Sequence, residues 1–114
     1  MKLYELHNKR VRHAIGLMSG SSCDGVDAAL VRLAGTGDEL RFKLLAFKTI
    51  PYPEGFRTRL LAPRKTAQEL CDLNFRLGNL LAEAAADMLE RAKEINVSVD
   101  FVASHGHTVA HHPP

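Results

Sequence analysis

AIGLMSGSSCDGVDAALV, residues 14–31, consists of two short apolar runs on either side of a small-residue turn. Each run has the length and the glycine boundary that are typical of a strand in a sheet. The pattern therefore predicts a β-hairpin whose tip is residues 20–27. Gly20 and Gly25 allow positive φ and let a ligand approach the backbone closely. Successive N–H groups in such a tip can form a concavity that binds an anion.

The side chains of this tip suit a nucleoside triphosphate. Ser21 and Ser22 offer hydroxyl groups, while Asp24 and Asp27 carry carboxylates that can hold Mg²⁺ directly or through water. The same residue types also form turns that bind nothing, because they adopt turn conformations at little cost. The tip is not a Walker P-loop, since no Gly-Lys-Ser/Thr follows it. On these residues alone, phosphate binding and an ordinary turn both stay open.

The rest of the chain predicts a mixed α/β order of elements. A third strand at residues 40–50 has apolar and basic residues that alternate in part. This pattern indicates an antiparallel edge strand with one face exposed to solvent. Prolines and a glycine at residues 51–55 then end the sheet. A strand that follows a helical crossover pairs in parallel with the earlier sheet. We therefore expect a three-stranded meander, a short helix at 54–61, a long helix at 67–94 and a parallel strand at 100–104.

The long helix is marked by its start and by its buried face. Thr66 and Glu69 have the spacing of a capping box. Apolar residues then recur at helical spacing; they are Leu70, Leu73, Leu77, Leu80, Leu81, Ala84, Met88 and Ala92. Asn74 and Gly78 also lie within this helix. We interpret them as part of a polar face and as a close helix contact, and the alternative is that Asn74 points toward a ligand cleft.

Length and composition describe one ordinary globular unit. The chain has 114 residues, 46% of them hydrophobic and 25% charged, which suits a single modest core. The net charge of +2 is too small to indicate nucleic acid or an anionic membrane as a partner, and no apolar run approaches the roughly 20 residues of a membrane span. We expect a flexible lead-in at residues 1–12 and a domain at 13–114. Two cysteines without metal-ligand spacing suit a reduced, cytoplasmic setting.

Two separate segments resemble one family of enzymes. Residues 15–27, I-G-L-M-S-G-S-S-C-D-G-V-D, resemble the N-terminal signature I-G-x-M-S-G-T-S-x-D-G-V-D of the anhydro-N-acetylmuramic acid kinases. Residues 105–113, H-G-H-T-V-A-H-H-P, are similar to that family's H-G-Q-T-V-x-H-x-P. The segments occur in the family's order and at about its spacing. The resemblance runs from about residue 13 onward and covers roughly the first third of a family member.

The resemblance implies a ribonuclease-H-like α/β fold of the actin-like ATPase type, here an incomplete half-domain. It implies that the hairpin tip binds ATP. Asp24 is then the better candidate to hold Mg²⁺, whereas Asp27 lies in the next strand and is the alternative that orients the turn. Cys23 stands where leucine is frequent and is expected to pack as a small apolar side chain; a reactive thiolate is the alternative. The implied ATP-binding residues are Gly20, Ser21, Ser22, Cys23, Asp24, Gly25, Val26 and Asp27. The implied sugar-binding residues are His105, Gly106, His107 and Thr108, and His107 replaces the family's usual glutamine.

The resemblance also implies a reaction. ATP phosphorylates the 6-oxygen of 1,6-anhydro-N-acetylmuramic acid while water opens the anhydro bridge at C1, and the product is N-acetylmuramic acid 6-phosphate in peptidoglycan recycling. A carboxylate must act as the general base on that water. The family's catalytic aspartate lies in a Gly-Asp-Phe-Arg-Arg type segment, and this chain contains no such segment. We therefore expect an N-terminal fragment that is inactive alone.

Other interpretations stay open beside the kinase. The chain suits a small non-catalytic α/β module that binds a nucleotide or a metal, and the histidines at 105, 107, 111 and 112 suggest a metal site that lacks a cysteine or acidic partner nearby. A ribonuclease-H-type nuclease would use Asp24 and Asp27 as paired metal ligands, which a glycine-rich turn fits poorly. An apolar face that is covered in a longer protein would favour a homodimer here.

Overall fold

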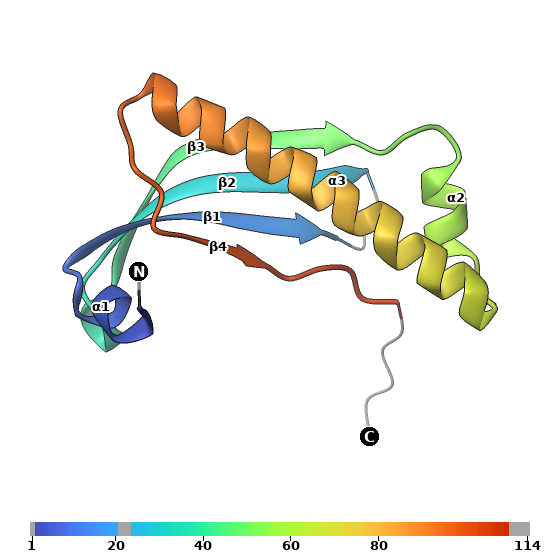
Figure 1. Ribbon diagram of the computed structural model, residues 1–114, viewed down its shortest axis with the longest axis horizontal. Helices are drawn as coiled ribbons and strands as arrows, with labels where there is room; N and C mark the ends of the chain where they lie inside the picture. The colour runs from blue at the N-terminus through green and yellow to red at the C-terminus, as the bar shows by residue number, and fades with distance from the viewer. Residues whose placement is uncertain (1, 21–23, 110–114) are drawn as a thin grey trace.

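The computed structural model describes residues 2–20 and 24–109 and is built on one four-stranded sheet (Figure 1). The strand order is β3-β2-β1-β4. The strands are β1 (Val11–Ser19), β2 (Gly25–Ala34), β3 (Arg41–Pro51) and β4 (Phe101–Ser104). The helices are α1 (Leu3–Asn8), α2 (Phe56–Leu61) and α3 (Ala67–Glu94), with a short 3-10 helix at Gly37–Glu39.

The pairing of the strands confirms the predicted meander and crossover. β1 pairs with β2, and β2 with β3, in antiparallel fashion, so that Ile15 lies opposite Leu30. β4 pairs with β1 in parallel, with Ile15 beside Val102. Because α3 connects β3 to β4 across one face of the sheet, the last strand returns to the edge beside β1 (Figure 1). The architecture is therefore mixed α/β.

The third strand lies at the sheet edge, as its sequence pattern predicts. Its alternation is imperfect because the register shifts between Leu30 and Val31 of β2, which pair with Ala46 and Leu44. Leu45 is the extra residue of this bulge, and both Leu45 and Ala46 pack against the core. Apart from the half-buried Ile50, the remaining basic and apolar residues of β3 are exposed to solvent.

The long helix has the bounds that its sequence predicts. The Thr66 hydroxyl accepts a hydrogen bond from the Glu69 N–H at 3.1 Å, and the Glu69 carboxylate accepts one from the Thr66 N–H at 3.3 Å, so the capping box is confirmed. After the helix the chain turns through Asn96, whose φ of 58° is left-handed. The buried face of α3 packs on β1 and β2. The shared core comprises Ile15, Leu17, Val26, Ala28, Leu30, Ala84, Met88 and Ala92.

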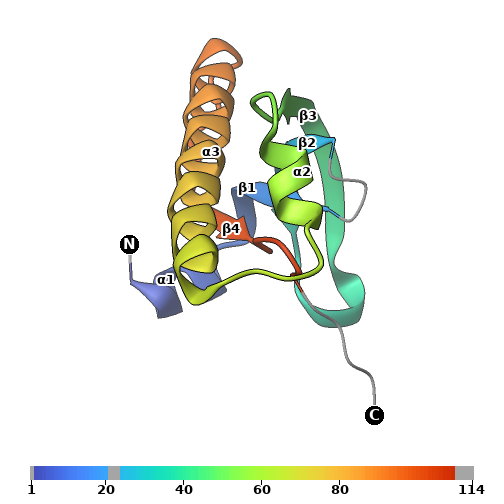
Figure 2. The same cartoon turned by 90° about the vertical axis from the view of Figure 1, so that its right-hand side faces the viewer.

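The two faces of the sheet differ in what covers them. α3 lies along one side, and no helix of the described residues covers the opposite side (Figure 2). Side chains that alternate with the buried ones therefore meet solvent: Met18, Leu44 and Phe47 are 45%, 54% and 58% exposed. The main hydrophobic core therefore lies between the sheet and α3, and a smaller cluster of Phe56, Leu60 and Leu73 packs between α2 and α3.

The N-terminal region differs from the flexible lead-in that we expect at residues 1–12. The structure has α1 at Leu3–Asn8, and β1 begins at Val11, whose partner in β2 is Ala34. This pairing is not visible in the sequence, because the surrounding residues are charged and their partner strand lies more than twenty residues away. The sheet therefore begins two residues before the expected domain boundary.

The start of β4 is joined to the start of β1 by Asp100. Its backbone N–H donates to the His13 carbonyl at 2.8 Å, and its carboxylate accepts from the His13 N–H at 2.9 Å. The Lys9 ammonium binds the other carboxylate oxygen. The Asp100 side chain is only 4% exposed. These bonds align β4 with β1 at the end of the sheet that lies opposite the hairpin tip.

We expect Asp100→Asn to reduce the free energy of unfolding at pH 7 by about 1–3 kcal/mol. Burial raises the pKa of Asp100, but the hydrogen bonds from Lys9 and His13 outweigh burial and lower the pKa below its ordinary 3.8. A carboxyl with a lowered pKa contributes stability above its unfolded pKa and loses that contribution as the pH falls through its folded pKa. Urea unfolding should therefore show a difference that shrinks below about pH 4.

Glu90→Gln is the matched control for this substitution, because its carboxylate is 71% exposed in a pair with Lys93 on α3. Its effect at pH 7 should be close to zero. Equal losses in the two variants would contradict the role assigned to Asp100.

Candidate functional site

The hairpin tip begins at the carboxyl end of β1 and ends at the start of β2. Gly20 and Asp24 are described, and the Asp24 side chain is exposed to solvent next to β2. The predicted ATP-binding residues Ser21, Ser22 and Cys23 lie outside the described residues.

The close approach of β3 to β2 requires a glycine at position 25. It lies opposite Pro51, and a Cβ added to Gly25 would come within 2.2 Å of the Ile50 carbonyl oxygen. No real side-chain carbon tolerates that distance, so only glycine lets β2 and β3 pair this closely beside the tip. This glycine therefore serves the strand geometry that holds the tip in place.

The next two residues of the predicted ATP site face opposite sides of β2. Val26 is 1% exposed and packs in the core, so its side chain is not available to a ligand. Asp27 lies opposite Thr49 of β3, and its carboxylate accepts a hydrogen bond from the Thr49 hydroxyl at 2.6 Å. This bond supports the alternative in which Asp27 orients the turn.

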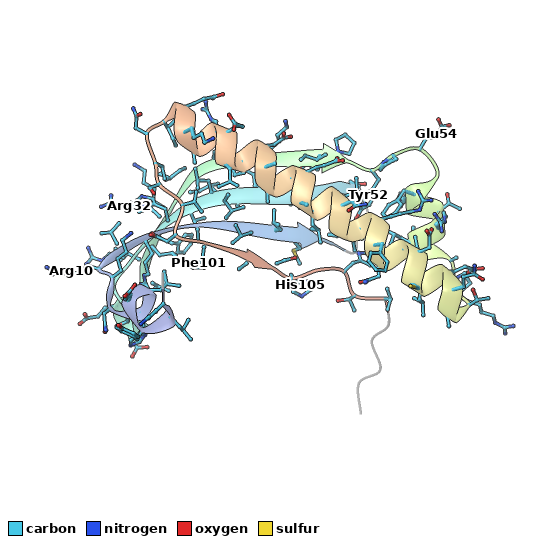
Figure 3. The ribbon with its side chains drawn as sticks, in the orientation of Figure 1. Arg10, Arg32, Tyr52, Glu54, Phe101 and His105 are labelled. Atoms are coloured by element: carbon cyan, nitrogen blue, oxygen red, sulfur yellow. The ribbon has the colours of Figure 1, made fainter. Side chains whose placement is uncertain are left out.

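The second sequence motif follows β4 and runs along the end of β1. The His105 N–H donates to the Leu17 carbonyl at 3.0 Å, which extends the parallel pairing past β4. Gly106 has a φ of 72°, and its carbonyl accepts from the Ser19 N–H at 3.1 Å. The chain therefore bends at Gly106 and brings His107 against the residue that precedes the hairpin tip. Figure 3 shows His105 and Tyr52 toward the carboxyl end of β1, whereas Arg10 lies at the opposite end of the sheet.

Ser19 is the point where the two motifs and β3 meet. It is only 1% exposed, and its hydroxyl is hydrogen-bonded to the Tyr52 hydroxyl. The same hydroxyl lies 3.0 Å from Nδ1 of His107, and the Ser19 carbonyl oxygen lies 2.9 Å from that nitrogen. Backbone and side chain of one buried serine thus connect the hairpin to the segment after β4 and to the end of β3.

A cavity of about 510 Å³ lies between α3 and residues 105–109. Leucines of α2 and α3 form its apolar wall, and His105, His107 and Asn74 supply polar groups. Asn74 therefore lies on a cavity, as its alternative interpretation requires, although it is also exposed. The interpretation of Gly78 as a close helix contact is wrong: a Cβ at Gly78 meets no described atom within 4 Å, because this stretch of α3 faces the open cavity.

The cavity wall formed by α2 is fixed to α3 by Asp72. Arg59 of α2 and Arg76 of α3 donate to the same Asp72 oxygen at 2.7 and 2.8 Å. Both hydrogen bonds lower the pKa of the Asp72 carboxyl, and the bond from Arg59 has the larger effect. This pairing holds Leu60 of α2 beside the cavity.

Two residues of this site were not predicted from the sequence, namely Ser19 and Tyr52. Ser19 had a usable signal, because it continues the buried alternation of Ile15 and Leu17 and is therefore a polar residue on the core face. Tyr52 had none, since its position depends on how the chain bends between Pro51 and Pro53. Thr108, which was predicted, is exposed and has no hydrogen bond within the described part of the chain.

The described residues hold neither a metal-ligand cluster nor a membrane-spanning helix. Residues 2–20 and 24–109 contain no group of three or more histidine, cysteine or acidic side chains placed to hold a metal ion. The histidines at 111 and 112 lie outside the described residues. Nor does any helix within these ranges have the length and apolar character needed to cross a bilayer.

Comparison with known proteins places the chain in a family. The family model for anhydro-N-acetylmuramic acid kinase matches residues 12–114. An anhydro-N-acetylmuramic acid kinase of Caldanaerobacter subterraneus subsp. tengcongensis is 39% identical over 98% of this chain, and one of Bacillus thuringiensis subsp. konkukian is 35% identical over 89%. The chain spans 29% and 28% of the length of these relatives. The chain therefore belongs to the anhydro-N-acetylmuramic acid kinase family.

Proposed function

We propose that this chain forms the part of an ATP-dependent sugar kinase that holds the phosphates of the nucleotide and one wall of the sugar cleft. The observation that carries the proposal is the meeting of two distant motifs at Ser19, which puts the hairpin tip and residues 105–107 at one end of the sheet. Ligands of α/β proteins bind at the carboxyl ends of strands, and β1 and β4 both end here. The sheet order and the α3 crossover support a ribonuclease-H-like fold of the actin-like ATPase type.

The proposed reaction transfers the terminal phosphoryl group of ATP to the 6-oxygen of 1,6-anhydro-N-acetylmuramic acid. Water adds to C1 as the bond between C1 and the 6-oxygen breaks, so ATP, water and the anhydro-sugar yield ADP and N-acetylmuramic acid 6-phosphate. Positioning and charge neutralisation dominate such transfers. In this proposal the backbone of the tip binds phosphate oxygens, and Asp24 is the residue that would hold Mg²⁺.

The remaining parts of the proposal concern the larger protein. The chain spans less than a third of its relatives, and no Gly-Asp-Phe-Arg-Arg type segment occurs in it. We place the general base, the second ATP-binding half and the adenine pocket in sequence beyond residue 114, so this chain alone is inactive. The role in peptidoglycan recycling and the cytoplasmic location follow the kinase assignment. The exposed apolar side chains on the uncovered sheet face are compatible with a homodimer.

Titration of the chain with Mg-ATP, followed by NMR of the backbone amides, tests this proposal. We expect the largest shifts at the tip and at Asp24, and Gly20→Val should reduce the affinity at least tenfold, because a branched side chain obstructs backbone contact with phosphate. Gly16→Val is the matched control, since a Cβ at Gly16 meets no described atom within 4 Å. Equal binding by the two variants would overturn the assignment of the tip to phosphate.

A further inference from the structure

The contacts of His107 determine which of its ring nitrogens carries a proton. Nδ1 lies 2.9 Å from the carbonyl oxygen of Ser19 and 3.0 Å from the Ser19 hydroxyl. A carbonyl oxygen can only accept a hydrogen bond, so an Nδ1 without a proton would place one lone pair against another at hydrogen-bond distance. The proton therefore resides on Nδ1, shared between the two oxygens of Ser19. The Ser19 hydroxyl is then left to donate toward Tyr52.

Nε2, the other ring nitrogen of His107, is a hydrogen-bond acceptor and not a donor. A neutral imidazole carries one N–H, so Nε2 of His107 keeps its lone pair and is a hydrogen-bond acceptor. Within the described part of the chain, the structure gives Nε2 no partner, and His107 is half-buried in the lining of the 510 Å³ cavity. The ring cannot rotate to exchange its nitrogens without breaking the bond to Ser19.

The other residues that line the cavity determine which kind of ligand can bind there. Leucines of α2 and α3 provide an apolar wall, and Asn74 provides an amide that both donates and accepts. We infer that His107 is a specificity-determining residue that accepts a hydrogen bond from a ligand hydroxyl group in this cavity. This inference rests on the proposed function, in which the ligand is an anhydro-sugar. A ligand that presents a carbonyl or carboxylate oxygen to Nε2 is disfavoured, because two acceptors then face each other.

The protonation of His107 can be measured without any substitution. Long-range ¹H–¹⁵N NMR of the ¹⁵N-histidine-labelled chain distinguishes the two neutral tautomers, and His107→Asn assigns the His107 signals among those of the six histidines. We expect protonated Nδ1 in the free chain and a shift of the Nε2 resonance when 1,6-anhydro-N-acetylmuramic acid is added. A proton on Nε2, or an Nε2 resonance that the sugar leaves unchanged, would overturn the inference.

Two variants separate the contact with the cavity from the contact with Ser19. An asparagine amide at position 107 can replace the Nδ1 donor toward Ser19 but does not reach the place of Nε2, whereas a glutamine amide reaches that place with an oxygen acceptor. We expect His107→Asn to weaken sugar binding about tenfold, which corresponds to about 1.4 kcal/mol, and His107→Gln to retain most of the affinity. Equal affinities of the asparagine variant and the parent chain would overturn the inference.

The nucleotide titration keeps this test distinct from that of the proposed function. A chain that binds Mg-ATP through the tip but carries the proton of His107 on Nε2 would refute only the role of His107. A chain with protonated Nδ1 that binds the sugar and shows no response to Mg-ATP would support the role of His107 and refute the nucleotide site.

Discussion

Gly25→Ala is expected to lower the free energy of unfolding by about 3 kcal/mol, near the upper end for overpacking of a closed site. The added Cβ would lie 2.2 Å from the Ile50 carbonyl oxygen and 2.9 Å from the Ile50 carbonyl carbon. Both are backbone atoms of the neighbouring strand, so no side chain can rotate away to make room. The two strands must separate at the end that carries the hairpin tip.

Guanidinium unfolding of Gly25→Ala measures this loss, and Gly16→Ala provides the control. Gly16 lies on the adjacent strand, and no described atom comes within 4 Å of a Cβ built there. The control should unfold within about 0.5 kcal/mol of the parent. An unchanged unfolding midpoint for Gly25→Ala would show that β2 and β3 do not need this close approach.

Leu30→Ala is expected to cost about 2–5 kcal/mol of stability. Leu30 is fully buried, and it packs in the layer between β2 and α3 that contains Ala84 and Met88. Because the opposite sheet face has no helix over it in the described residues, this single layer supplies most of the hydrophobic stabilisation. A domain of this size has about 5–15 kcal/mol in total, so the variant should lose a large share of its stability and melt well below the parent chain.

Leu44→Ala removes the same atoms from the other face of the sheet. Leu44 lies on the edge strand β3 and is 54% exposed, so the loss should stay below about 1 kcal/mol. Thermal unfolding followed by circular dichroism compares the two variants directly. Similar melting temperatures for both would contradict a core that lies on one face of the sheet only.

Local signals in the sequence predict much of this fold. The bounds of α3, Ala67–Glu94, agree with the prediction because the Thr66 cap and a long run of helical periodicity both lie within the helix itself. The meander and the parallel fourth strand follow from the same kind of argument, since tight connections favour hairpins and a helical crossover favours parallel pairing. α1 and the first residues of β1 were not predicted, because α1 is a six-residue helix without a buried face and Val11 pairs with Ala34 farther along the chain.

The candidate site was predictable only in outline. That residues 105–107 lie beside the end of β1 follows from parallel pairing, but the tautomer of His107 depends on a carbonyl that no pattern reveals. The role of Tyr52 depends on the bend after β3, and the space beside Gly78 depends on how α3 crosses the sheet. These features arise from packing between distant segments, whereas sequence patterns report on neighbours along the chain.

The long separation of Ser19 and His107, 88 residues, has a consequence for synthesis. The hairpin leaves the ribosome early, but the bonds at its Ser19 end form only when β4 and residues 105–107 have been made and have docked alongside. Closing so large a loop costs entropy before any contact repays it, so this junction belongs to the slow, late events of folding. Until then Ser19, which is 1% exposed in the folded chain, remains accessible to water.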